Sequence, residues 1–164
     1  MLLNMLGFNL AWFGLIFFGN TFIPISLLMI VLHLSMFSNI NNEMRLVVLV
    51  TVIGVSVDSL LHFFGFFIFP DSISMPPWLV ILWVCFACTI CHSLTFLSSS
   101  IILQAVVGAI FSPLSYIAAQ NIGAVNFGYS LLTTYITLAL IWGGLFIFFF
   151  YLKSVMTETR NKYA

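Results

Sequence analysis

Charged residues are nearly absent from this chain. Only 5% of its 164 residues are Asp, Glu, Lys or Arg, and the formal net charge is +0. A water-soluble domain of this length cannot cover its surface with so few charges. The shortage of basic residues also excludes a surface for nucleic acid and a polybasic anchor for anionic lipid headgroups.

Histidine is scarce as well, with three residues in the whole chain. Membrane desaturases and hydroxylases hold their iron pair with many more histidines than this. No HxxxH, HxxHH or ExxH pair occurs on any predicted helix. The sequence therefore predicts neither a metal site nor a cofactor.

Long apolar runs make up most of the chain, which is 63% hydrophobic with a mean hydropathy of +1.23. A membrane-crossing helix needs roughly 20 apolar residues. We expect residues 1–164 to form a single integral membrane domain. Its predicted fold is an all-α bundle of about six transmembrane helices: Leu2–Phe18, Phe22–Phe37, Met44–Phe69, Trp78–Leu97, Ile101–Ala119 and Phe127–Leu152.

The few basic residues indicate the orientation in the membrane. Arg45 follows the second predicted helix, and the others, Lys153, Arg160 and Lys162, follow the sixth. An even number of spans places both regions on one side, which the positive-inside rule makes cytoplasmic. We expect a multi-pass protein with both termini in the cytoplasm and Asp71 on the opposite side.

Asp58 and His62 are ionisable residues inside a predicted span. Ionisable groups in hydrocarbon cost about 2.5 to 3.5 kcal/mol, so each is a candidate functional group. Together with Thr51, Gly54 and Gly65 they lie on one face of the third helix, which we expect to face the bundle. Two interpretations remain open: an Asp58–His62 pair that fixes packing, or a proton relay or ligand contact.

His33 and His92 lie on helices of the same direction, each about 7 Å from the cytoplasmic end by helix rise. The two rings can therefore meet. Gln104 and Asn9 are expected in the same leaflet, and Glu43 begins the third helix at its edge. Two histidines and a glutamate suit zinc or iron in chemical type, although their spacing gives no support for a metal.

The segment Cys88–His92 spells CxxCH, the attachment pattern of c-type haem. Haem is attached on the outer side of a membrane, whereas this segment is predicted near the cytoplasmic end of its helix. We interpret the cysteines as small packing residues in apolar surroundings.

Several segments together resemble the bacterial inner-membrane family catalogued as domain of unknown function 2878. They are Trp12, His33, VSVDSLLHFFG around Asp58, PPWLVILWVCFACTICHSL from Pro76 and GAIFSPLSYIAAQNIGA from Gly108. The chain departs from the family pattern at Cys91, where an Asn is expected, and near Ala119, where a Gly is expected. The resemblance implies the bacterial inner (cytoplasmic) membrane and a gene context of fatty-acid-modifying enzymes, but no activity.

Three functions follow as hypotheses. The first is a non-enzymatic accessory to membrane-lipid or fatty-acid modification, with the bilayer and other membrane-lipid enzymes as partners and no nucleic acid. The second is a small proton-coupled carrier that uses Asp58 and His62. The third is an intramembrane enzyme that modifies lipid through His33 and His92.

Overall fold

The computed structural model describes residues 2–36, 40–70 and 74–163, so Asp71 lies outside the described part of the chain. The elements in chain order are α1 (Leu2–Phe18), the 3₁₀ turn η1 (Gly19–Phe22), α2 (Ile23–Ser35), α3 (Ile40–Phe63), β1 (Phe67–Ile68), α4 (Pro77–Ile90), the 3₁₀ turn η2 (Thr95–Ser99), α5 (Ile101–Ile122), β2 (Asn126–Phe127) and α6 (Leu131–Tyr163).

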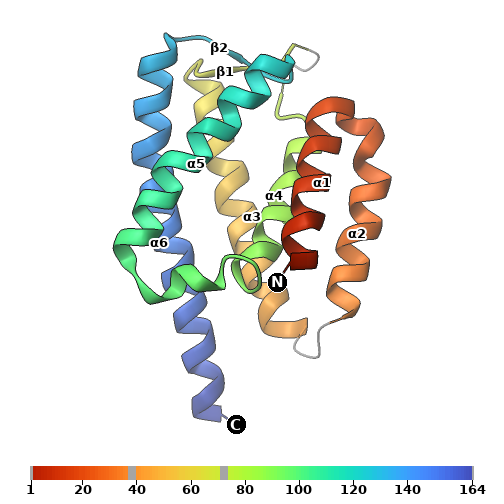
Figure 1. The fold of residues 1–164 in the computed structure, drawn as a ribbon, viewed down its shortest axis with the longest axis vertical. Helices are drawn as coiled ribbons and strands as arrows, with labels where there is room; N and C mark the ends of the chain where they lie inside the picture. The colour runs from red at the N-terminus through yellow and green to blue at the C-terminus, as the bar shows by residue number, and fades with distance from the viewer. Residues whose placement is uncertain (1, 37–39, 71–73, 164) are drawn as a thin grey trace.

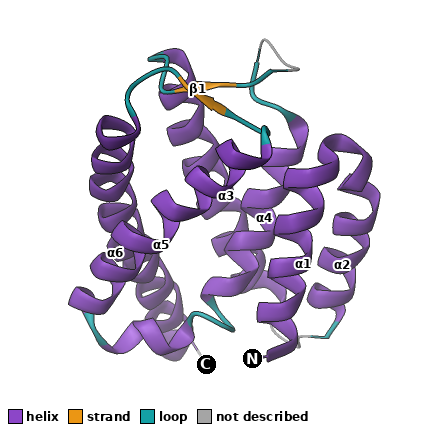
Figure 2. Ribbon diagram, turned by 45° about the horizontal axis from the view of Figure 1, so that its top comes forward, coloured by secondary structure: helices purple, strands orange, loops and turns teal. Residues whose placement is uncertain are grey.

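The helices run alternately up and down the bundle, so the two termini lie at the same end (Figures 1 and 2). α5 packs on α6, and α4 packs on both α3 and α1. α2 lies at the outside of the bundle, against α1 and α4. The all-α prediction is therefore confirmed, with one minor addition of β-structure.

That addition is an antiparallel pairing of β1 with β2 at the end of the bundle opposite the termini (Figure 2). Phe67 pairs with Phe127, and Ile68 pairs with Asn126. Gly65, with φ 77°, ends the helical part of the segment before β1 and redirects the backbone. Only glycine adopts this conformation without a steric cost.

The prediction of about six membrane-crossing helices is not supported. Within the described residues, four helical runs are long and apolar enough to cross a membrane: Leu2–Ser35, Glu43–Phe63, Ile101–Ile122 and Leu131–Thr157. The first run turns back on itself at η1, so it is a hairpin of α1 and α2 (Figure 1). α4 has 14 residues, about 21 Å by helix rise, which is less than the roughly 30 Å of a bilayer core. The described part of the chain thus has the apolar helices of a multi-pass membrane protein, but fewer helices of membrane-spanning length than predicted.

Two predicted helices also end early. The third was expected to reach Phe69 but ends at Phe63, because the chain turns at Gly65 into β1. The fourth was expected to reach Leu97 but ends at Ile90. Beyond it, the backbone N–H groups of His92 and Leu94 both donate to the Thr89 carbonyl, which closes the helix with a tight turn.

Gly54, which the sequence placed on the inner face of α3, lies where α3 and α4 are in close contact. A methyl group at Gly54 would overlap the indole ring of Trp83. Gly54 therefore allows the two helices to approach, as a small residue does in membrane bundles. Asp58, one turn later on the same face, is fully buried.

Candidate functional site

His33, Glu43 and His92 meet at the end of the bundle where the termini lie. Glu43 Oε1 is 2.7 Å from His92 Nε2 and 3.3 Å from His33 Nε2. The two imidazole rings lie edge to face, with centroids 4.8 Å apart. The side chains of His33, Glu43 and His92 are only 14%, 10% and 17% exposed. We call these three residues the His–Glu–His cluster.

Each member of the cluster comes from a different element. His33 lies in the last turn of α2, and Glu43 lies in the first turn of α3. α2 and α4 run in the same direction (Figure 1), so His92, just after α4, reaches the same depth. Helix rise predicted the two histidines at one depth. In the structure Glu43 lies between them at that depth.

Asn4 in α1 completes this neighbourhood, and the sequence interpretation missed it. Its Nδ2 donates to the Cys88 carbonyl and its Oδ1 accepts from the Ser93 N–H, both at 3.2 Å. Its Nδ2 also lies 3.4 Å from His33 Nδ1. The depth argument could have found Asn4, since it lies about as far from its helix end as His33 does.

The contacts of Asn4 determine which nitrogen of His33 carries the hydrogen. Cys88 O needs a donor and Ser93 N–H needs an acceptor, so the Asn4 amide has one possible orientation. Its nitrogen then faces His33 Nδ1, which must be the acceptor. The hydrogen of a neutral His33 therefore lies on Nε2 and points toward Glu43.

The other two predicted members do not join the cluster. Gln104 is buried and donates from Nε2 to the Leu97 carbonyl at 2.9 Å. Asn9 donates from Nδ2 to the Met5 carbonyl within its own helix at 2.9 Å. Gln104 therefore braces η2 against α5, and Asn9 faces a cavity described below.

Asp58 does not pair with His62, contrary to one sequence interpretation. Its carboxylate accepts a 2.7 Å bond from Trp83 Nε1 and bonds of 2.8 and 2.9 Å from the Tyr116 hydroxyl. His62 Nδ1 instead lies 2.8 Å from the Phe67 carbonyl. The two residues are one turn apart, but α3 ends just after His62, whose ring follows the chain into β1.

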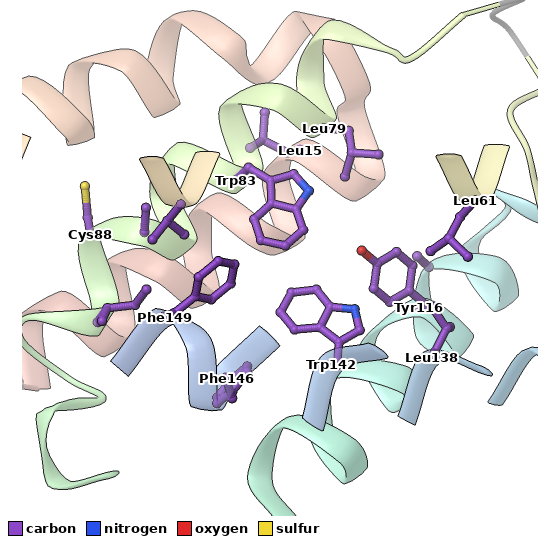
Figure 3. Packing of buried hydrophobic residues seen from close by; sticks show 14 of the residues in the cluster. Leu15, Leu61, Leu79, Trp83, Cys88, Tyr116, Leu138, Trp142, Phe146 and Phe149 are labelled. Carbon is purple, nitrogen blue, oxygen red and sulfur yellow. The ribbon is translucent and has the colours of Figure 1, made fainter. Parts of the chain in front are cut away.

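The two donors to Asp58, Trp83 and Tyr116, lie among other aromatic rings (Figure 3). Trp83 stacks on Trp142 with ring centroids 5.0 Å apart and planes 4° apart, and Tyr116 stacks on Phe67 at 4.9 Å. Figure 3 shows the Tyr116 hydroxyl turned toward the two indoles. Asp58 thus fixes aromatic side chains from α4 and α5 in one orientation.

These aromatic residues form part of the wall of a cavity of about 760 Å³. α1, α4, α5 and α6 all contribute to it. Most of the lining is apolar, including Trp12, Leu82, Phe86, Val107 and Phe146, and the polar side chains in it are Asn9, Thr89, Ser93, Ser115 and Tyr116. Its volume is within the range of small-molecule sites, roughly 300–1,000 Å³.

Comparison with known families decides where the chain belongs. The sequence profile of the family described as "Protein of unknown function (DUF2878)" matches residues 1–148. The chain belongs to this family. The resemblance expected from the sequence is therefore confirmed.

Membership in DUF2878 brings no activity with it, because the family is defined without one. The match includes every residue of the His–Glu–His cluster, Asp58 with its two donors, and Asn4. No match was found among the curated proteins or among the solved structures.

Proposed function

We propose that this DUF2878 protein binds a lipid acyl chain within the bilayer and acts as an accessory to membrane-lipid or fatty-acid modification. We place it in the bacterial inner membrane with both termini in the cytoplasm and with membrane-lipid enzymes as its partners. The observation that carries the proposal is the cavity of about 760 Å³ with its largely apolar lining.

The chemistry of the lining favours an acyl chain over a polar metabolite. Isolated hydroxyl and amide groups such as Asn9 and Thr89 are spread among aromatic and aliphatic side chains. A polar ligand would lose its hydrogen bonds to water there without recovering them. An apolar chain loses nothing on entry and gains contacts with the walls.

The cavity is open at the outer surface of the protein. Phe13 and Phe111 both line it, yet they are 57% and 65% exposed. Side chains that face both the cavity and the outside mark its edge. If the outside is the hydrocarbon of a bilayer, an acyl chain can enter sideways without crossing water.

The second candidate function is an intramembrane enzyme that acts on such a chain through His33 and His92. The observation that favours it is the placement of Glu43 between the two histidines. Asn4 also joins the cluster to Ser93, which lines the cavity. The carrier hypothesis lacks such support, because Asp58 bonds Trp83 and Tyr116 rather than His62.

A lipid profile of cells that lack the gene tests the proposal. We expect an altered acyl-chain composition in the deletion strain, restored by the wild-type gene. The variant Val107→Trp, which fills the cavity from α5, should fail to restore it. Val106→Trp is the matched control, because Val106 is the neighbouring exposed residue and lies outside the lining.

Two results would reject this function. One is an unchanged acyl composition in the deletion strain, which would favour transport of another solute. The other is equal restoration by Val107→Trp and Val106→Trp at equal abundance, because occupation of the cavity would then not matter.

A further inference from the structure

We propose that the His–Glu–His cluster binds a divalent zinc ion through His33, Glu43 and His92. It is the one group of three potential metal ligands found in the described part of the chain, and its ligand atoms all lie within 4.8 Å of one another. None of the three residues lines the acyl-chain cavity, so zinc binding does not depend on the function proposed above.

The convergence of three elements on one point is the first argument. α2, α3 and the turn after α4 each contribute one ligand residue. These residues are 10 and 49 positions apart from Glu43 along the chain, so local sequence does not create the arrangement. The fold itself brings two imidazoles and one carboxylate together in a largely buried place.

The donor atoms select the kind of cation. Two imidazole nitrogens with one carboxylate oxygen suit zinc and related transition metals, whereas calcium and magnesium take oxygen ligands. In a tetrahedral site with bonds of about 2.1 Å, ligand atoms lie about 3.4 Å apart. The nitrogen-to-oxygen distances of 3.3 and 2.7 Å are both shorter than that separation, by less than an ångström.

Both His33 Nε2 and His92 Nε2 are directed at the same carboxylate oxygen, Glu43 Oε1. A zinc ion bound to His33 Nε2 and His92 Nε2 requires both nitrogens to be free of hydrogen, so any hydrogen on either Nε2 is transferred to the Nδ1 of the same ring. This transfer breaks the 3.4 Å contact of His33 Nδ1 with Asn4. The two 3.2 Å bonds from Asn4 to the end of α4 remain.

Three protein ligands leave one position of a tetrahedral zinc open, as in catalytic rather than structural sites. A water molecule or an anionic group of a ligand fits this position. The sequence alone predicted no metal, because the three ligands share no helix and no recognisable spacing. Only the folded chain shows their proximity.

The test uses the full chain purified in detergent, stripped with a chelator and dialysed against zinc chloride. We expect about one zinc per chain by elemental analysis. His33→Ala, His92→Ala and Glu43→Gln should each lower zinc affinity by at least about tenfold. His62→Ala is the matched control, since it removes the third histidine but lies at the other end of α3.

Zinc should also raise the unfolding temperature of the wild-type protein, because a ligand that binds only the folded state stabilises it. The rise should be absent in Glu43→Gln, which keeps the side-chain shape and is the variant most certain to fold. Cobalt substitution identifies the ligands independently: a site of nitrogen and oxygen gives no thiolate charge-transfer absorption.

Three results would overturn the zinc site. The first is a folded wild-type protein that binds no stoichiometric zinc. The second is equal zinc affinity in His92→Ala and the wild type. The third is a cobalt–thiolate band that disappears in Cys91→Ser, which would assign the metal to the nearby cysteines instead.

Discussion

Trp83 donates a 2.7 Å hydrogen bond from its indole nitrogen to Asp58, which is fully buried in the middle of the bundle. This bond joins α4 to α3, and the Tyr116 hydroxyl adds α5 to the same carboxylate. Trp83 and Tyr116 are also walls of the cavity. The fully buried Asp58 therefore holds two of the side chains that shape the space in which we place the lipid.

The variant Asp58→Asn should be tolerated. An asparagine oxygen in the place of Asp58 Oδ2 can accept from both Trp83 Nε1 and the Tyr116 hydroxyl, which lie 2.7 and 2.9 Å from that atom, so both donors keep an acceptor. We expect a loss of about 0.6 kcal/mol, the average for hydrogen bonds within membranes, measured by chemical unfolding in detergent micelles. Asp58→Leu should cost more, about 1–3 kcal/mol, because it leaves buried polar groups unpaired. Loss of lipid-related function in Asp58→Asn at normal abundance would show that the carboxylic acid itself is required.

A double-mutant cycle should show that Tyr116 acts through Asp58. Tyr116→Phe removes the hydroxyl and keeps the stack on Phe67. It should destabilise the wild-type protein by about 1 kcal/mol but have little effect in the Asp58→Leu background. Equal costs in both backgrounds, measured by the same unfolding assay, would mean that the hydroxyl has another role.

Two glycines provide a matched test of the contact between α3 and α4. Gly54→Ala places a methyl group on the Trp83 ring and should cost about 1–3 kcal/mol. Gly144→Ala in α6 meets nothing within 4 Å, so it should be neutral or slightly stabilising through its better helix propensity. Thermal unfolding compares them directly, and similar melting temperatures for the two variants would contradict the packing described here.

The orientation in the membrane is testable with reporter fusions. Alkaline phosphatase fused after Ala164 should be inactive if the C-terminus is cytoplasmic, whereas a fusion after Asp71 or Ala124 should be active. The prediction rests on the basic residues near the start of α3 and in the last part of α6. Activity at Ala164 with inactivity at the other two positions would reverse the orientation and move the His–Glu–His cluster to the outer side.

Much of the fold was predictable because apolar runs determine helices when few polar residues interrupt them. α1 has the predicted bounds, and α2 differs by one or two residues at each end. The end of α4 was not predictable from local sequence, since its backbone groups there bond to Asn4 in a distant helix. The count of about six membrane-crossing helices is not supported for the same reason, because α4 by itself is shorter than a bilayer core.

The site was predictable only as far as depth and helix direction allow. These two properties place His33, His92 and Glu43 at one level, and the folded chain brings them together. They cannot show which side chains meet across the bundle. The donors to Asp58 lie 25 and 58 residues away in sequence, so helical spacing pointed to His62 instead.

The central claim, that the cavity holds an acyl chain, is tested most directly by native mass spectrometry of the protein purified from membranes in mild detergent. We expect the wild-type protein and Val106→Trp to retain a bound lipid or fatty acid, and Val107→Trp to lose it. Retention of the same lipid by Val107→Trp, or its absence from the wild-type protein, would contradict the account.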